Sequence, residues 1–177
     1  MHNDKKMKSS AKIRLYYCLF FLSVLVLAEF ECPADIKNAY CQCSTGTFYL
    51  LIRCTRPSPT NAAFEPFINL SSLEKENTYF LEISNKNYKS VPSYAIRDLD
   101  MYTLHLASNQ IEYVEKKAFE NARFLENLVL KSNKLTAFFS SSTLEDLVLF
   151  DLSSNRIEIL TERMFWSMTS LETLVLS

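Results

Sequence analysis

Four cysteines lie close together near the start of the chain, and their spacing is typical of disulfide chemistry. They are Cys32, Cys41, Cys43 and Cys54, while a fifth, Cys18, belongs to an apolar N-terminal run. An even set confined to one short stretch of a secreted chain predicts two disulfides. Cys41 and Cys43 are too close in sequence to bond comfortably to each other. Two pairings stay open: Cys32–Cys43 with Cys41–Cys54, or Cys32–Cys41 with Cys43–Cys54. A zinc site is the alternative use, but no paired C-x-x-C spacing is present.

The remaining residues show no pattern that is typical of a catalytic site. His105 is the only histidine after the N-terminal run, so a metal site would lack a second histidine or a free cysteine. Glu82 or Asp151 could face it, but a lone surface histidine is the simpler interpretation. The chain has no G-x-S-x-G sequence, and Gly46 is its only glycine, which excludes a phosphate-cradling loop. We therefore expect no catalytic residue, metal or cofactor, and a protein that is not an enzyme.

The N-terminal segment has the pattern of a secretory signal. Several lysines and an arginine precede LYYCLFFLSVLVLA, an apolar run over residues 15–28. This run is shorter than the roughly 20 residues of a membrane-spanning helix. It matches the apolar part of a signal peptide, and Ala28 suits the small-residue cleavage rule. We predict a signal peptide over residues 1–28 and a secreted, extracellular protein, with no membrane span within the given sequence. An uncleaved signal anchor is the alternative.

Two further observations concern partners and modification. Asn69-Leu70-Ser71 is an N-glycosylation sequence, so Asn69 is a candidate glycan acceptor on a surface segment. The formal net charge is −1, and the basic residues form no stripe after the signal. Nucleic acid is therefore not an expected partner.

The elements that would carry any binding site come from a repeat in the second half of the chain. The stretch LHLASNQI alternates like a half-buried strand and is then broken by Asn109. The break returns at Asn133 after 24 residues and at Asn155 after another 22. Each unit fits L-x-x-L-x-L-x-x-N-x-L, with isoleucine, methionine or phenylalanine in some leucine positions. This pattern and period are the signature of a leucine-rich repeat.

The repeat divides the chain into a cap, a linking segment and five units. A weaker copy starts at Thr78 and holds Lys86 where the asparagine is expected. The unit that contains TAFFSSSTLEDL is two residues short and lacks the convex Ala-Phe pair found at Ala118-Phe119. The predicted parts after the signal are a cysteine-rich N-terminal cap (29–56), an irregular linking segment (57–77), and repeats at 78–100, 101–124, 125–146, 147–170 and 171–177.

The asparagines are explained by the turn that follows each strand. Such a turn leaves backbone N–H and C=O groups inside the protein. Each of these groups would lower the stability by about 1–3 kcal/mol if it had no hydrogen-bond partner. A side-chain amide carries two donor hydrogens and an acceptor oxygen. We therefore interpret Asn109, Asn133 and Asn155 as a structural ladder in which each amide serves its own turn and the next one. A row of ligand-binding amides is the weaker alternative, because these side chains would lie behind the sheet.

The expected fold is a leucine-rich repeat solenoid, an α/β-type horseshoe arc. Short parallel strands would line its concave face, irregular or short helical turns its convex face, and the disulfide-bonded cap would cover its N-terminal end. Leu106, Leu130 and Leu152 should then form one buried column. The sequence ends at Ser177, just before the position where the repeat period predicts the next ladder asparagine. We expect a fragment that lacks further repeats and a C-terminal cap, and a membrane tether could lie in that missing part.

Binding would use the outward positions of the concave strands, because these lie side by side on a rigid sheet. Mixed charge with apolar and aromatic spots suits a protein or peptide partner. The alternative for each position is plain solvated sheet surface. The candidate partner-binding residues are Phe80, Glu82, Tyr102, His105, Val129, Lys131 and Asp151.

The cap sequence CPADIKNAYCQCS, the strand FYLLIRC and the repeat end VEKKAFENARFLENL resemble a known family. They are similar to secreted and cell-surface leucine-rich repeat proteins with a cysteine-rich N-terminal cap, over Cys32 to Ser177. The C-P-x-x-I…C-x-C-S form is most similar to arthropod proteins like the non-catalytic subunit of Oplophorus luciferin monooxygenase. The resemblance implies the pairing Cys32–Cys43 with Cys41–Cys54, and protein association without catalysis. Two functions follow as expectations: an extracellular module that recognises a protein or peptide, or alternatively a non-catalytic stabilising subunit of a secreted enzyme complex.

Overall fold

The computed structural model describes most of the chain beyond the N-terminal segment. The predicted signal peptide over residues 1–28 and much of the linking segment lie outside the described residues. The described ranges are 32–55, 67–122, 124–139 and 142–177.

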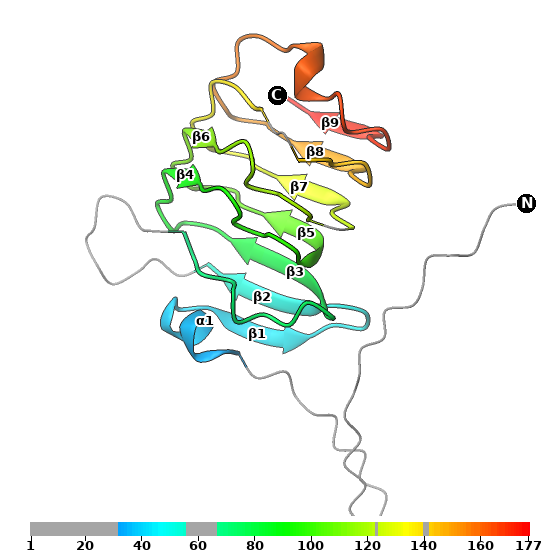
Figure 1. Ribbon diagram of the computed structural model, residues 1–177. Coiled ribbons are helices and arrows are strands. Elements are labelled where there is room, and N and C mark those ends of the chain that lie inside the picture. Colours follow the sequence, from blue (N-terminus) through cyan, green and yellow to red (C-terminus); the bar gives the residue numbers. More distant parts are fainter. Residues whose placement is uncertain (1–31, 56–66, 123, 140–141) are drawn as a thin grey trace, which may run out of the picture.

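The architecture is a solenoid of stacked parallel strands (Figure 1). Seven strands form one sheet in the order β1-β2-β3-β5-β7-β8-β9, in which β1 is antiparallel to β2 and every later pair is parallel. Two short strands, β4 and β6, pair in parallel away from this sheet, along the left side of the view in Figure 1. The strands are β1 (Gln42–Thr45), β2 (Leu50–Cys54), β3 (Thr78–Ile83), β4 (Ser90–Val91), β5 (Asp100–His105), β6 (Tyr113–Val114), β7 (Asn127–Val129), β8 (Leu149–Asp151) and β9 (Thr173–Val175).

Helical structure is sparse. The cap contains the five-residue helix α1 (Ala34–Asn38), and a single 3₁₀ turn, η1 (Glu162–Met164), precedes the last strand. None of the helices in the described part of the chain has the length and apolar character that a bilayer span requires.

The core is built from the inward positions of the strands, which the repeat period brings into register. Leu104 pairs directly with Leu128, which pairs with Phe150, and all three side chains are fully buried. A second column follows the ends of these strands: Leu106 N–H donates to the carbonyl of Val129, and Leu130 N–H to that of Asp151, each at 2.8 Å. The predicted column of Leu106, Leu130 and Leu152 is therefore confirmed. Each buried leucine stabilises the fold by roughly 1.5–3 kcal/mol.

The turn after each strand has a fixed backbone conformation. The residue before each ladder position has a positive φ, between 54° and 58°, in four successive units: Asn85, Ser108, Ser132 and Ser154. The N–H of Ser108 donates to the carbonyl of Lys131 at 3.0 Å, and the N–H of Ser132 to that of Ser153 at 2.9 Å. Left-handed backbone is disfavoured for residues other than glycine, so hydrogen bonds to the next unit must hold these turns in place.

One expectation about the short unit 125–146 is wrong. The convex aromatic position, held by Phe119 in the preceding unit, is not empty here, because Phe138 fills it and is 1% exposed. Its ring lies 6.4 Å from that of Phe119 and 4.9 Å from that of Phe150, measured between centroids. Phe138 follows its ladder residue Asn133 by five positions, whereas Phe119 follows Asn109 by ten. The shorter unit reaches the interior sooner, so the ring enters from an earlier position.

The cap is closed by two disulfides within itself and is joined to the repeats by backbone pairing. Cys32 is bonded to Cys43 and Cys41 to Cys54, which is the connectivity that the resemblance implies. Cys54 ends β2, and β2 pairs in parallel with β3 of the first repeat, so the cap strand is part of the large sheet. Ile36 of α1 is fully buried and belongs to the hydrophobic core.

Lys86 explains why the first repeat lacks a ladder asparagine. Its side chain is buried, 2% exposed, and its Nζ donates to the carbonyl of Ala39 at 2.8 Å, 5.6 Å from the ring centre of Tyr40. The unit before this repeat is the cap, where the carbonyl to be reached belongs to the segment after α1 rather than to a neighbouring strand. The lysine side chain, which is longer than that of asparagine, reaches this carbonyl.

Candidate partner-binding face

The outward side chains of the large sheet form rows that cross the strands. We call this surface the open sheet face, because the side chains of the same strands that point the other way fill the core. Its central row follows the strand register from Arg53 in β2 to Val175 in β9. The members of this row are Arg53, Glu82, His105, Val129, Asp151 and Val175.

Four of the seven predicted binding residues lie in this central row. Glu82, His105, Val129 and Asp151 pair in succession on neighbouring strands, and each is partly exposed. The sequence did not single out Arg53, whose Nε lies 2.7 Å from Oε2 of Glu82. This ion pair neutralises the charge at the cap end of the row.

A second row, which contains Phe80, runs beside the first. A bulge separates Phe80 from Tyr102, the other aromatic side chain among the predicted binding residues. The pairing of β3 with β5 shifts by one residue, so Phe80 pairs with Thr103 and Tyr102 becomes the extra residue of β5. Phe80 contacts Tyr49 of the cap instead, with ring centres 5.7 Å apart. Tyr102 stays 38% exposed. The two aromatic side chains therefore occupy different rows.

A third row begins at Tyr102 and continues along the starts of the later strands. Glu126 N–H donates to the carbonyl of Tyr102, Val148 N–H to that of Glu126, and Glu172 N–H to that of Val148, at 2.8–3.1 Å. Glu126, Val148 and Glu172 are thus backbone neighbours at the margin of the open sheet face, directly before β7, β8 and β9, although none was among the predicted binding residues. The repeat register contains this information, because each follows the leading leucine of its unit.

The last predicted binding residue, Lys131, and the candidate glycan acceptor are both accessible. Lys131 is exposed two residues past Val129, where β7 has ended. Asn69 is exposed as well, and its Oδ1 accepts a hydrogen bond from the N–H of Ser71 at 2.9 Å.

The ladder asparagines lie behind the sheet, away from this face. Asn109 and Asn133 are 5% and 7% exposed. The Nδ2 of Asn133 donates to the carbonyls of Leu130 in its own unit and Leu106 in the preceding one, both at 2.9 Å, and its Oδ1 accepts from Ile111 N–H at 3.1 Å. Each amide thus forms hydrogen bonds within its own turn and with the preceding unit. The expectation that it would serve the next turn along the chain is wrong. None of its hydrogen-bonding capacity is directed at a ligand.

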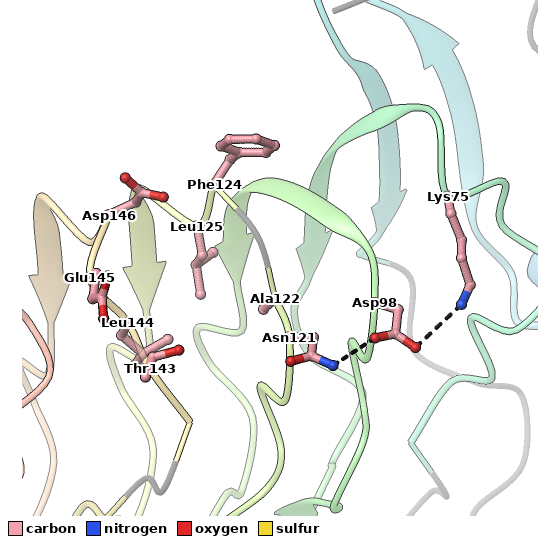
Figure 2. A pocket seen from close by; sticks show the side chains of 10 residues that line it. All are labelled: Lys75, Asp98, Asn121, Ala122, Phe124, Leu125, Thr143, Leu144, Glu145 and Asp146. Carbon is pink, nitrogen blue, oxygen red and sulfur yellow. Dashed lines mark hydrogen bonds and ion pairs between the residues drawn. The ribbon is translucent and has the colours of Figure 1, made fainter. Parts of the chain in front are cut away.

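A shallow hollow of about 590 Å³ lies at the edge where the strands begin (Figure 2). On its cap side Asp98 joins two units: its Oδ1 accepts from Asn121 at 2.9 Å and its Oδ2 from Lys75 at 3.3 Å. The hydrogen bond from Asn121, followed by that from Lys75, lowers the pKa of Asp98 below its usual 3.8. Asp98 therefore links neighbouring parts of this edge through hydrogen bonds. A general acid must hold a proton near neutral pH, which requires a raised pKa, whereas that of Asp98 is lowered.

The described residues offer little else for chemistry. Among them, no three metal-ligating side chains come together, and His105 has only Glu82 and Val129 beside it in its row. All four cap cysteines are in disulfides.

Comparisons with protein-family models and with curated proteins found no match for this chain.

Proposed function

We propose that this protein is an extracellular binding module of the leucine-rich repeat type, which recognises a protein or peptide through its open sheet face. The observation that carries the proposal is the register of that face. Five successive parallel strands, from β3 to β9, present outward side chains in rows, and their inward side chains match the repeat pattern of the sequence. Neighbouring strands of a sheet lie about 4.8 Å apart, so such rows form a rigid, finely spaced surface.

The composition of the face suits a macromolecular partner. Aromatic and apolar side chains such as Phe80, Tyr102 and Leu149 lie among charged ones such as Arg53 and Glu82. Protein interfaces have this mixture, with apolar anchors that bury most of the area and polar groups around them. A rigid sheet also loses little conformational entropy when a partner docks.

Secretion is the second part of the proposal and rests on three features. The signal-like segment 1–28, the two cap disulfides and the exposed Asn69 all suit an oxidising compartment. Expression of the full chain in insect cells should release a product into the medium that begins near residue 29. An Asn69→Gln variant should be smaller than this product by one N-glycan. A product retained in cells with its N-terminal segment intact would contradict secretion.

Site-specific photo-cross-linking tests the binding face. The photoreactive benzoyl-phenylalanine replaces Val129 on the open sheet face in one sample and Tyr113 of β6 in the control, which is exposed away from that sheet. Each sample is mixed with extracellular fluid of the source organism and irradiated. A discrete cross-linked protein should form from position 129 and not from 113. Cross-links only from position 113 would refute the proposed face.

The alternative of a non-catalytic subunit makes a different prediction for the same experiment. The cap pairing agrees with the one that the resemblance implies, so it is compatible with this alternative as well as with the recognition module. The cross-linked partner would then be an enzyme that co-purifies in a one-to-one ratio. A cross-linked partner without catalytic activity would support the recognition module over the enzyme subunit.

A further inference from the structure

The open sheet face is not uniform in charge from one end to the other. Its later half carries three carboxylates: Asp151 in β8, and Glu126 and Glu172, which directly precede β7 and β9. The basic group at this end is Lys131, at the far end of β7. In the cap half, by contrast, Arg53 and Glu82 neutralise each other. The later half of the face is therefore acidic.

The carboxylates of this acidic half are available to a partner. Within the described ranges, neither Glu126 nor Glu172 takes part in an ion pair. Asp151 accepts one hydrogen bond through its Oδ1, from the N–H of Ser153 at 2.8 Å, which leaves its second oxygen for another donor. Asp151 lies in β8, between the strands that Glu126 and Glu172 precede, so these three negative charges share one part of the surface and attract a positively charged partner.

Apolar side chains lie between the three carboxylates. Val148 separates Glu126 from Glu172 along the third row, and Leu149 is the next residue of β8. Val129 flanks Asp151 in the central row. Since one strand lies between Glu126 and Glu172, their backbones are about 9–10 Å apart. This arrangement is an apolar centre with acidic groups around it, which is the anatomy of a specific protein interface.

We propose that the acidic half of the open sheet face, formed by Glu126, Val148, Leu149, Asp151 and Glu172, binds a basic segment of a protein partner. The partner would present arginine or lysine side chains to the carboxylates and an apolar side chain to Val148 and Leu149. Arginine fits best, because its planar guanidinium can donate to two carboxylate oxygens at once. The inference rests on the proposed function and adds the chemistry of the partner and its place on the sheet.

The test is an unbiased selection of peptide ligands. A random peptide library displayed on phage is panned against the full chain, secreted with both disulfides formed. Enriched peptides should carry arginine or lysine beside an apolar residue. A synthetic copy of the most enriched peptide is then titrated by fluorescence anisotropy, and its affinity should fall as salt is raised.

Charge reversal places the peptide on the protein. The double variant E126K/E172K should weaken binding at least about tenfold, since it replaces attraction with repulsion at two positions. The matched control is E158K/E162K, which changes the net charge equally at two exposed residues outside the sheet. This control should bind as the original does. Equal weakening by both variants would indicate a general charge effect and overturn the proposed site.

The remaining outcomes separate this inference from the proposed function. Peptides without basic residues that lose binding in Val129→Asp but not in E126K/E172K would overturn the charge inference and keep the binding face. Peptides whose binding is unchanged in all of these variants would bind elsewhere and overturn both.

Discussion

Removing one amide from the ladder should destabilise the protein far more than removing one from the sheet surface. In Asn133→Ala the Nδ2 donor to Leu106 and Leu130 is lost, and so is the Oδ1 acceptor for Ile111 N–H. Asn133 is 7% exposed, so water cannot readily replace these hydrogen bonds. The variant also breaks the contact between two successive repeats, on which solenoid stability depends.

The expected loss follows from the groups that are left behind. A buried N–H without an acceptor costs about 1–3 kcal/mol, and each lost hydrogen bond to a carbonyl about 1 kcal/mol. We expect the free energy of unfolding to fall by about 3 kcal/mol for Asn133→Ala. This is a large fraction of the 5–15 kcal/mol that is typical of a folded domain.

Asn127→Ala is the matched control. Asn127 belongs to the same repeat, but its side chain lies on the open sheet face and makes one long hydrogen bond, 3.2 Å from Nδ2 to Thr103 Oγ1. Its removal should cost about 0.5 kcal/mol or less, as for other surface positions. Urea denaturation of both variants with intact disulfides, followed by circular dichroism, measures the difference. The slope m must stay constant, because a change in m would report loss of cooperativity between repeats.

A small effect would refute the reasoning. If Asn133→Ala lost less than about 1 kcal/mol, or no more than Asn127→Ala, the amide would not be satisfying buried backbone groups at a net gain. Hydrogen exchange gives an independent reading: Ile111 N–H should be protected in the original protein and should exchange faster in Asn133→Ala. Unchanged protection would lead to the same conclusion.

Three further perturbations test other parts of the structure. Phe138→Ala should cost about 3–5 kcal/mol in a urea melt because it empties the convex aromatic position, whereas Phe139→Ala, at 49% exposed, should be almost neutral; equal losses would contradict the assignment of Phe138. Replacing Cys54 and its bonded partner with alanine should lower stability by about 2–4 kcal/mol, and an unchanged melting temperature would argue against the observed bond. An NMR titration should place the pKa of Asp98 below 3.8, and Asn121→Ala should raise that pKa. Because the pKa is lowered in the folded state, Asp98 stabilises the fold above its usual pKa. This stabilisation disappears as the pH falls through the lowered pKa of the folded state.

The features that repeat could be predicted from the order of the residues alone. Leu104, Leu128 and Phe150 occupy the same position in successive units, so each has the same neighbours and the same need for burial. The ladder asparagines recur for the same reason, since every turn leaves the same backbone groups inside. The outward rows of the sheet follow from this register, and most of the candidate binding face could be predicted from it.

The interruptions of the repeat, by contrast, are explained by contacts that form in the folded chain. Lys86 departs from the pattern where the neighbouring unit is the cap, and its side chain donates to the carbonyl of Ala39 there. Phe138 fills a position that the spacing of its own unit does not reveal, because the rings of Phe119 and Phe150 define the space. The disulfide pairing and the bulge at Tyr102 likewise depend on which chain segments meet. A periodic residue inherits its surroundings from the pattern, whereas a residue at an interruption takes them from contacts that exist only after folding.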